Sequence, residues 1–155
     1  PVVLVQTLTK PDWSVLVEGY AEVLPPKPFE PALRPGQRLR FRLRANPAKR
    51  LAATGKRVAL KTPAEKVAWL ERRLLEGGFR LLEGEQGPLV RILQDAFLEA
   101  RRGKGEGGEG RLVQVQAVLF EGRLEVVDPG KAEATLKRGI GPGKALGLGL
   151  LSLAP

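Results

Sequence analysis

The clearest pattern along the chain is a strict alternation of arginine and apolar side chains between residues 38 and 45. Alternate side chains of a β-strand point to opposite faces of a sheet, so this period of two predicts a half-buried strand. The strand would have an apolar face of Leu39, Phe41, Leu43 and Ala45. Its other face would carry the cations Arg38, Arg40, Arg42 and Arg44.

A helix is expected after residue 62, where the start signals are complete. Thr62 suits the N-cap, Pro63 the first helical position and Glu65 the third, which together form a capping box. Apolar residues then recur at helical spacing until Gly77-Gly78 ends the segment. The expected apolar stripe consists of Ala64, Val67, Leu70, Leu74 and Leu75.

The remaining apolar segments predict further strands and one more helix. Asp128 begins the second helix, which runs to about residue 137. Residues 89–100 fit a strand or a helix, and the glycine-rich stretch 101–110 that follows favours one arm of a hairpin. The other expected strands are 2–8, 57–61, 79–82, 111–118, 124–127 and 145–153. Glu121-Gly122 is expected to form a tight turn, and residues 49–56 a linker.

From residue 57 onward the expected order is strand, helix, strands, helix, strand, which is the βαββαβ arrangement of a ferredoxin-like, or RRM-like, unit. We therefore predict an α+β protein of tandem ferredoxin-like units. Residues 1–56 would be the remainder of an N-terminal unit that lacks its opening strand and helix, followed by a linker. Residues 57–155 would be the C-terminal unit with a glycine-rich loop. A single irregular α+β domain is the alternative.

Composition excludes several kinds of site. The chain has no cysteine and no histidine, so it holds no disulfide, no thiolate zinc site, no histidine metal site and no Ser-His-Asp or Cys-His catalytic group of its own. No apolar run approaches the ~20 residues of a membrane span, and the first residues do not resemble a signal peptide. The cytoplasm is the expected compartment. A low content of Asn, Met and Cys beside abundant Arg, Glu and Pro is typical of thermophiles.

A net charge of +9 among 155 residues favours a polyanionic partner, with nucleic acid before a membrane surface. The arginine face of residues 38–44 would follow an RNA or DNA backbone, or it would be a solvated sheet face opposite carboxylates. Arg101, Arg102 and Lys104 lie on a glycine-rich hairpin tip that can insert into a nucleic-acid groove. A solvated turn is the alternative there, since Glu106 and Glu109 partly neutralise the tip.

A third candidate is the glycine-rich loop near the C-terminus, flanked by Arg138 and Lys144. Its glycines are Gly139, Gly141, Gly143, Gly147 and Gly149. Glycines let a backbone approach a phosphate with free N–H groups, whereas a kinked edge strand is the structural alternative. The loop is neither a P-loop, because Ala145 follows Gly143-Lys144, nor a dinucleotide fingerprint, because the third glycine is missing.

The stretch Gly139-Ile140-Gly141-Pro142-Gly143-Lys144-Ala145-Leu146-Gly147-Leu148-Gly149 resembles the C-terminal glycine-rich loop of the RAMP superfamily of CRISPR-associated proteins. Together with the arginine strand and the basic hairpin, it makes the chain similar to the CasE family. These endoribonucleases mature CRISPR RNA and remain in the Cascade complex. The resemblance covers nearly all of the chain but only the C-terminal portion of the family.

This resemblance implies a reaction, a set of partners and roles for several residues. The expected reaction is a metal-independent and cofactor-free cut at the base of a CRISPR repeat stem-loop, where a 2′-hydroxyl attacks the adjacent phosphate and leaves a cyclic phosphate. The expected partners are that RNA and the other Cascade subunits, with no membrane. Arg101 and Arg102 would enter the RNA major groove, Lys104 would stand near the scissile phosphate, and the glycine-rich loop would support the RNA-facing surface.

The chain departs from the family pattern at its N-terminal side. The family's catalytic histidine and accompanying tyrosine lie in an N-terminal strand and helix, and these 155 residues contain no histidine. We therefore expect the chain to bind hairpin RNA and to cleave it slowly or not at all. The alternatives are a non-catalytic RRM-like RNA-binding module, against which the low aromatic content of 5% argues, and a subunit whose basic faces serve protein assembly.

Overall fold

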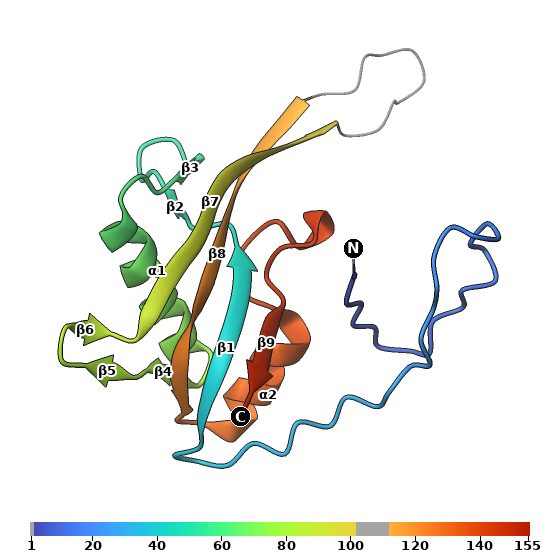
Figure 1. The fold of residues 1–155 in the computed structure, drawn as a ribbon. Helices are drawn as coiled ribbons and strands as arrows, with labels where there is room; N and C mark the ends of the chain where they lie inside the picture. Colours follow the sequence, from blue (N-terminus) through green and yellow to red (C-terminus); the bar gives the residue numbers. More distant parts are fainter. Residues whose placement is uncertain (1, 102–111) are drawn as a thin grey trace. The chain divides into compact units, whose positions relative to one another are not determined.

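The structure is a computed structural model that describes residues 2–101 and 112–155. The chain divides between Ala32 and Leu33 into two compact units, a smaller N-terminal one and a larger C-terminal one. The larger unit is built on a five-stranded antiparallel sheet (Figure 1) in the order β4-β8-β1-β9, with β7 also paired to β8. These strands are β1 (Arg38–Ala45), β4 (Phe79–Leu81), β7 (Val90–Arg101), β8 (Leu112–Val126) and β9 (Leu151–Ala154).

Two helices cover one face of this sheet, α1 (Pro63–Glu76) and α2 (Pro129–Arg138). A short 3₁₀-helix, η1 (Lys144–Leu146), follows α2. Two small hairpins are inserted between the main elements, β2 (Ala48–Arg50) with β3 (Arg57–Ala59), and β5 (Glu83–Gly84) with β6 (Gly87–Pro88).

The alternation in β1 confirms the predicted half-buried strand. The strand is buried at every second residue, and its four apolar side chains are at most 8% exposed. They share one core with Leu70 and Leu74 of α1 and Leu136 of α2. Burial of a large aliphatic or aromatic side chain contributes about 1.5–3 kcal/mol. The helices therefore cover the apolar face of β1, and the arginines lie on the other face.

The α+β class is confirmed, and the larger unit has ferredoxin-like connectivity. β1, α1 and the β4–β7 edge form one split βαβ unit around β8, and β8, α2 and β9 form a second around β1. The opening strand is therefore β1, whereas we expected it at residues 57–61. Strand β3 pairs only with β2, so residues 49–56 are part of a hairpin and not a linker between domains. The expected boundary at 56/57 does not coincide with the division of the compact units at 32/33.

The smaller unit contains no helix or strand among its described residues, 2–32. The predicted strand at 2–8 is therefore wrong. Val2, Leu4 and Leu8 are at least 70% exposed, because the β-branched run has no neighbouring strand with which to form a ladder. Backbone hydrogen bonds close two turns further on, from Leu16 to Trp13 and from Tyr20 to Val17, each 3.0 Å.

Helix α1 begins and ends where the sequence predicted. Thr62 Oγ1 accepts from the Glu65 N–H at 3.1 Å, and Glu65 Oε2 accepts from the Thr62 N–H at 3.1 Å. The buried face differs from the expected stripe, because Leu75 and Ala64 are exposed while Lys66 and Trp69 are each 2% exposed. This face is rotated because α1 packs against the glycine-rich loop as well as against the sheet.

Strand β8 runs without interruption through Gly122, where we expected a turn. A Cβ on Gly122 would lie 2.3 Å from the carbonyl oxygen of Leu89 and 2.9 Å from the Phe41 ring. The glycine is thus required for a close approach of neighbouring backbone, and not for a change of chain direction. Likewise, the expected last strand at 145–153 is shorter, because η1 occupies its beginning.

We predict that Gly122→Ala destabilises the fold by about 2–4 kcal/mol, since the added methyl group meets backbone that cannot move aside. Urea unfolding measures this loss. Gly130→Ala is the matched control, because its Cβ would meet only Asp128 Oδ1, at 3.5 Å, inside helix α2. There we expect a neutral or slightly stabilising effect. Equal stabilities of Gly122→Ala and the wild type would contradict the close approach.

The capping box also predicts how stability depends on pH. Hydrogen bonds from the backbone N–H groups of Thr62 and Lys61 hold the pKa of the Glu65 carboxyl below its ordinary value of 4.5. A carboxyl with a lowered pKa in the folded state stabilises the fold above its unfolded pKa, and this contribution is lost as the pH falls through the folded pKa.

Glu65→Ala should therefore lower the midpoint of thermal unfolding at pH 7, and the difference from the wild type should narrow below pH 4. Melting curves across this range test the prediction. Glu71→Ala is the control on the same helix, because Glu71 makes no ion pair among the described residues. A difference that stays constant between pH 7 and pH 3 would show that the Glu65 charge is not involved.

Candidate nucleic-acid interface

The topology brings three connecting regions to one end of the sheet. β1 and β7 run toward this end, and β8 and β9, their antiparallel neighbours, begin there. The regions are the β2–β3 hairpin after β1, the outer ends of β7 and β8, and the glycine-rich loop before β9. Figure 1 shows them together at the top of the sheet. We call this the ribbon end of the sheet.

The β7–β8 ribbon is the part of the sheet that projects furthest. Ala45, the last residue of β1, pairs with Val118, while the ladder between β7 and β8 continues to the pair Arg101–Leu112. Beyond β1 the ribbon is therefore two-stranded for about 20 Å at ~3.4 Å per residue. Arg101 is the last residue of β7, and Arg102 and Lys104 lie outside the described residues.

A partly buried polar cluster at the base of the ribbon was not expected from the sequence. Lys66 of α1 is 2% exposed, forms an ion pair with Asp95 of β7 and donates a 3.0 Å hydrogen bond to the Lys61 carbonyl oxygen. Gln116 of β8 donates to Asp95 Oδ1 at 2.7 Å. These bonds connect both strands of the ribbon to α1. The signal in the sequence was the helical spacing that puts Lys66 on the same face as Trp69 and Leu70.

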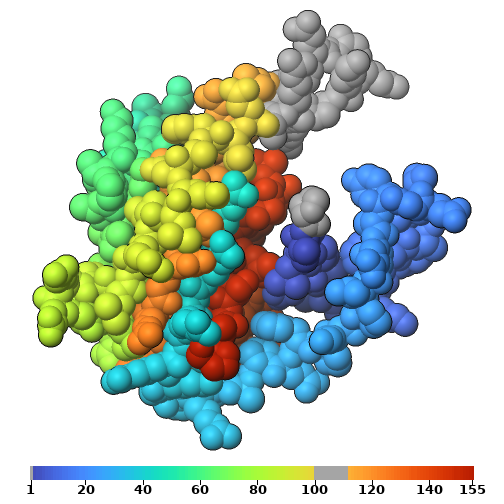
Figure 2. All heavy atoms as spheres, viewed as in Figure 1, coloured from blue at the N-terminus to red at the C-terminus, as the bar shows by residue number. Residues whose placement is uncertain are grey.

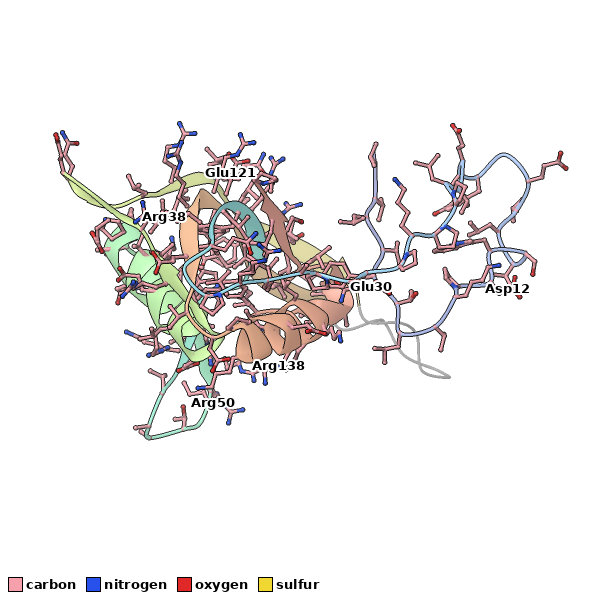
Figure 3. The ribbon with its side chains drawn as sticks, turned by 90° about the horizontal axis from the view of Figure 1, so that it is seen from below. Asp12, Glu30, Arg38, Arg50, Glu121 and Arg138 are labelled. Atoms are coloured by element: carbon pink, nitrogen blue, oxygen red, sulfur yellow. The ribbon has the colours of Figure 1, made fainter. Side chains whose placement is uncertain are left out.

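The arginine face of β1 lies on the side of the sheet away from the helices, and two of its four side chains are paired with carboxylates. Arg42 Nε lies 3.1 Å from Glu121 and Arg38 Nε 3.7 Å from Glu125. Figure 3 shows Arg38 and Glu121 on this side. In Figure 2, the strands of this face are visible side by side as yellow, orange, cyan and red segments. For these two arginines, the structure matches a solvated face with neutralising partners.

The other two arginines of β1 have no Asp or Glu partner among the described residues. Arg40 Nε donates to the Pro155 carbonyl oxygen at 2.9 Å. Arg44 stands at the ribbon end of β1, opposite Leu119, with its side chain exposed. Arg44 is therefore the member of the row whose charge is most available to a ligand.

The glycine-rich loop closes on the protein itself. Gly149 donates its N–H to the Arg44 carbonyl oxygen at 2.7 Å and accepts from the Ile140 N–H at 2.8 Å. Gly139 and Gly147 also donate to backbone carbonyls, those of Thr135 and Lys144. At Gly141 an added Cβ would stand 3.0 Å from the Trp69 ring. The expectation that the glycines leave their N–H groups free for phosphate is therefore wrong for Gly139, Gly147 and Gly149.

All five glycines of this loop have a positive φ, between +74° and +94°. That region of conformational space favours glycine, which explains the composition of the loop. The fold also brings Lys144 close to the residue that follows Arg138. Arg138 ends α2, and the Lys144 side chain reaches back so that its Cε would be 3.4 Å from a Cβ on Gly139. Both side chains are exposed at the ribbon end of the sheet.

The β2–β3 hairpin adds further cations. Part of it, residues 49–56, was expected to be a linker. No acidic residue occurs between positions 46 and 64. The cations of this segment are Lys49, Arg50, Lys56, Arg57 and Lys61, and all five are exposed. The signal in the sequence for this cationic segment was a run of positive charges that no acidic residue interrupts. With Arg44, Arg138 and Lys144, these residues make the ribbon end strongly positive.

Two other features are absent from the described part of the chain. Residues 2–101 and 112–155 contain no group of three or more Asp or Glu side chains placed to hold a metal ion. No helix within those ranges is long and apolar enough to cross a membrane.

Comparison with known proteins identifies the family. The family model described as CRISPR associated protein matches residues 1–155. The CRISPR-associated endoribonuclease Cse3 of Thermus thermophilus is 83% identical over 155 residues, which are 100% of this chain and 74% of that protein. The Cascade subunit CasE of Escherichia coli is 37% identical over 146 residues, 87% of this chain and 67% of that protein.

A solved structure of a Cse3 endoribonuclease bound to a 19-nucleotide RNA matches the fold with a TM-score of 0.88 and 83% identity. The match covers 97% of this chain and 71% of that one. Family model, sequence identity and fold thus agree with the resemblance seen in the arginine strand and the glycine-rich loop. The chain belongs to the Cse3/CasE family of CRISPR-associated endoribonucleases.

Proposed function

We propose that this chain binds the stem-loop of a CRISPR repeat RNA at the ribbon end of its sheet, as part of an endoribonuclease that produces mature CRISPR RNA. One observation carries the proposal. The topology places a projecting two-stranded ribbon between cationic loops, where Arg44, Arg138 and Lys144 are exposed. The similar Cse3 was solved with RNA, and the similar CasE is a Cascade subunit, so we also propose the other Cascade subunits as partners. The cytoplasm is the proposed compartment, because the proposed substrate is an RNA transcript.

In this proposal the ribbon is the element that reads the RNA stem. The major groove of A-form RNA is deep and too narrow for a helix, but a slim ribbon can enter it near the end of a stem. Arg101, Arg102 and Lys104 would bring three positive charges to the phosphates that line this groove. The cluster of Lys66, Asp95 and Gln116 supports this role, because it holds the base of the ribbon against α1.

The proposed cleavage needs no metal ion. A 2′-hydroxyl oxygen attacks the adjacent phosphorus while the bond from phosphorus to the 5′-oxygen breaks, which leaves a 2′,3′-cyclic phosphate and a 5′-hydroxyl. The reaction needs a base for the 2′-hydroxyl proton, an acid for the leaving oxygen and a cation for the charge on the phosphorane. Lys104 is our candidate for that cation.

The absence of histidine from these 155 residues favours a second candidate function, RNA binding without cleavage by this chain alone. Histidine is the side chain best suited to transfer protons near neutral pH. We therefore propose strong binding of the stem-loop together with slow cleavage or none.

The test is to incubate the chain with an end-labelled CRISPR-repeat hairpin RNA in EDTA, and to combine a denaturing gel with a salt-titrated binding assay. We expect tight binding that weakens steeply with salt. Arg102→Ala and Lys104→Ala should each weaken binding severalfold, and Lys104→Ala should also slow any cleavage. Lys131→Ala, at the start of α2, is the matched control and should leave both unchanged. Binding that does not respond to salt or to these substitutions would refute the proposal.

A second prediction separates the two kinds of arginine on β1. Arg44→Ala should lower RNA affinity severalfold and reduce the slope of log K against log [salt] by about 1, because its charge has no carboxylate partner among the described residues. Arg42→Ala should have little effect, because Glu121 neutralises Arg42 at 3.1 Å. The same salt titration measures both. Equal losses for the two variants would show that the RNA contacts the whole arginine face.

A further inference from the structure

We propose that the β2–β3 hairpin is a second phosphate-binding element, which contacts the backbone of the same RNA on the helix side of the ribbon. This inference rests on the proposed function, since it assumes that an RNA stem is held at the ribbon end. It adds a site that neither the arginine strand nor the glycine-rich loop supplies. It also places phosphate contacts on the helix side of the ribbon.

The pairing of the hairpin places like charges opposite each other. Arg50 and Arg57 are direct cross-strand partners. The Cβ atoms of such a pair are about 5 Å apart, and like charges at this distance destabilise a sheet. An isolated two-stranded hairpin is at best marginally stable, so it gains nothing from this repulsion. An anion bound between the two guanidinium groups converts the repulsion into attraction.

The surroundings of the hairpin do not neutralise this charge. Of the cations on the hairpin, Lys49 has a carboxylate partner, since its Nζ lies 3.5 Å from Glu65 Oε1. Among the described residues, the side chains of Arg50, Lys56 and Arg57 form no ion pair. The turn itself is well formed, with hydrogen bonds from Leu51 to Lys56 at 2.9 Å and from Gly55 to Leu51 at 2.8 Å. The cations are thus held on a defined scaffold without acidic partners.

The position of the hairpin fits an RNA bound to the ribbon. β2 begins three residues after β1 ends, at the base of the projecting ribbon. Figure 3 shows Arg50 on the helix side of the sheet, opposite to the side that carries Arg38 and Glu121. On that other side, carboxylates already neutralise Arg38 and Arg42. The hairpin therefore adds unpaired cations on the helix side of the ribbon, while Arg44 supplies one on the other side.

Arginine is suited to this task because its planar guanidinium donates two parallel hydrogen bonds to a phosphate. Contacts of this kind set the position of a nucleic acid and do not read its sequence. The hairpin would therefore strengthen binding of any stem-loop and determine how the stem lies against the protein. It would not select among repeat sequences.

The experiment compares the wild type with Arg50→Gln/Arg57→Gln by fluorescence anisotropy, with a labelled CRISPR-repeat hairpin RNA at several salt concentrations. We expect the double variant to bind tenfold or more weakly at low salt, and the slope of log K against log [salt] to fall by about 2. The loss should be the same for a hairpin of scrambled stem sequence. Arg50→Lys/Arg57→Lys should recover most of the salt slope.

The matched control is Arg72→Gln/Lys131→Gln, which removes the same charge from exposed positions away from the ribbon end and should leave the slope unchanged. The melting temperature of Arg50→Gln/Arg57→Gln should be unchanged or raised, since the repulsion between the two arginines is gone. A wild-type slope in this variant overturns the inference while the proposed function stands. A wild type that binds the RNA without salt dependence overturns both.

Discussion

Strand β8 is the element on which the rest of the larger unit depends. It pairs with β1 along one edge, and with β4 and then β7 along the other. Its neighbour changes from β4 to β7 near Gly122, where only a glycine leaves room for the Leu89 carbonyl oxygen and the Phe41 ring. Since β8 is much longer than β1, its outer part pairs with β7 alone. The projecting ribbon is thus a direct result of unequal strand lengths in one antiparallel sheet.

The distribution of charge follows from the same topology. Arg38 and Arg42 of β1 face Glu125 and Glu121 of β8, because antiparallel register places them directly opposite. Cations in the connections after β1 and α2 have no such strand opposite them. The positive charge that gives the chain its net charge of +9 is therefore not equally available over the whole surface. It is available to a polyanion mainly at the ribbon end, where Arg44, the β2–β3 hairpin and Lys144 lie.

Buried polar groups and glycines hold this end in place. Lys66 and Asp95 place an ion pair under the ribbon, and Gln116 extends it to the second strand. The Lys66 side chain is 3% exposed and the Asp95 side chain 36% exposed, so the pair is buried on the helix side only and links α1 to the ribbon. On the other side of β1, Gly149 bonds to Arg44 and Gly141 packs on Trp69. Gly139, Gly147 and Gly149 donate their N–H groups to backbone carbonyls, so this part of the loop acts as a backbone clamp.

The sequence by itself determined the elements that depend on local patterns: the alternation of β1, the capping box of α1, the helix at Asp128 and the extended arms of the hairpin. Family membership also followed from the sequence, because the glycine-rich loop and the arginine strand are unusual in combination. Pairing partners were decided only in the tertiary structure. Residues 2–8 have the composition of a strand but no neighbour, Gly122 looks like a turn but lies within β8, and residues 49–56 look like a linker but form a cationic hairpin. A strand or a charged site exists only when another segment lies beside it, and single-residue periodicity contains no information about that segment.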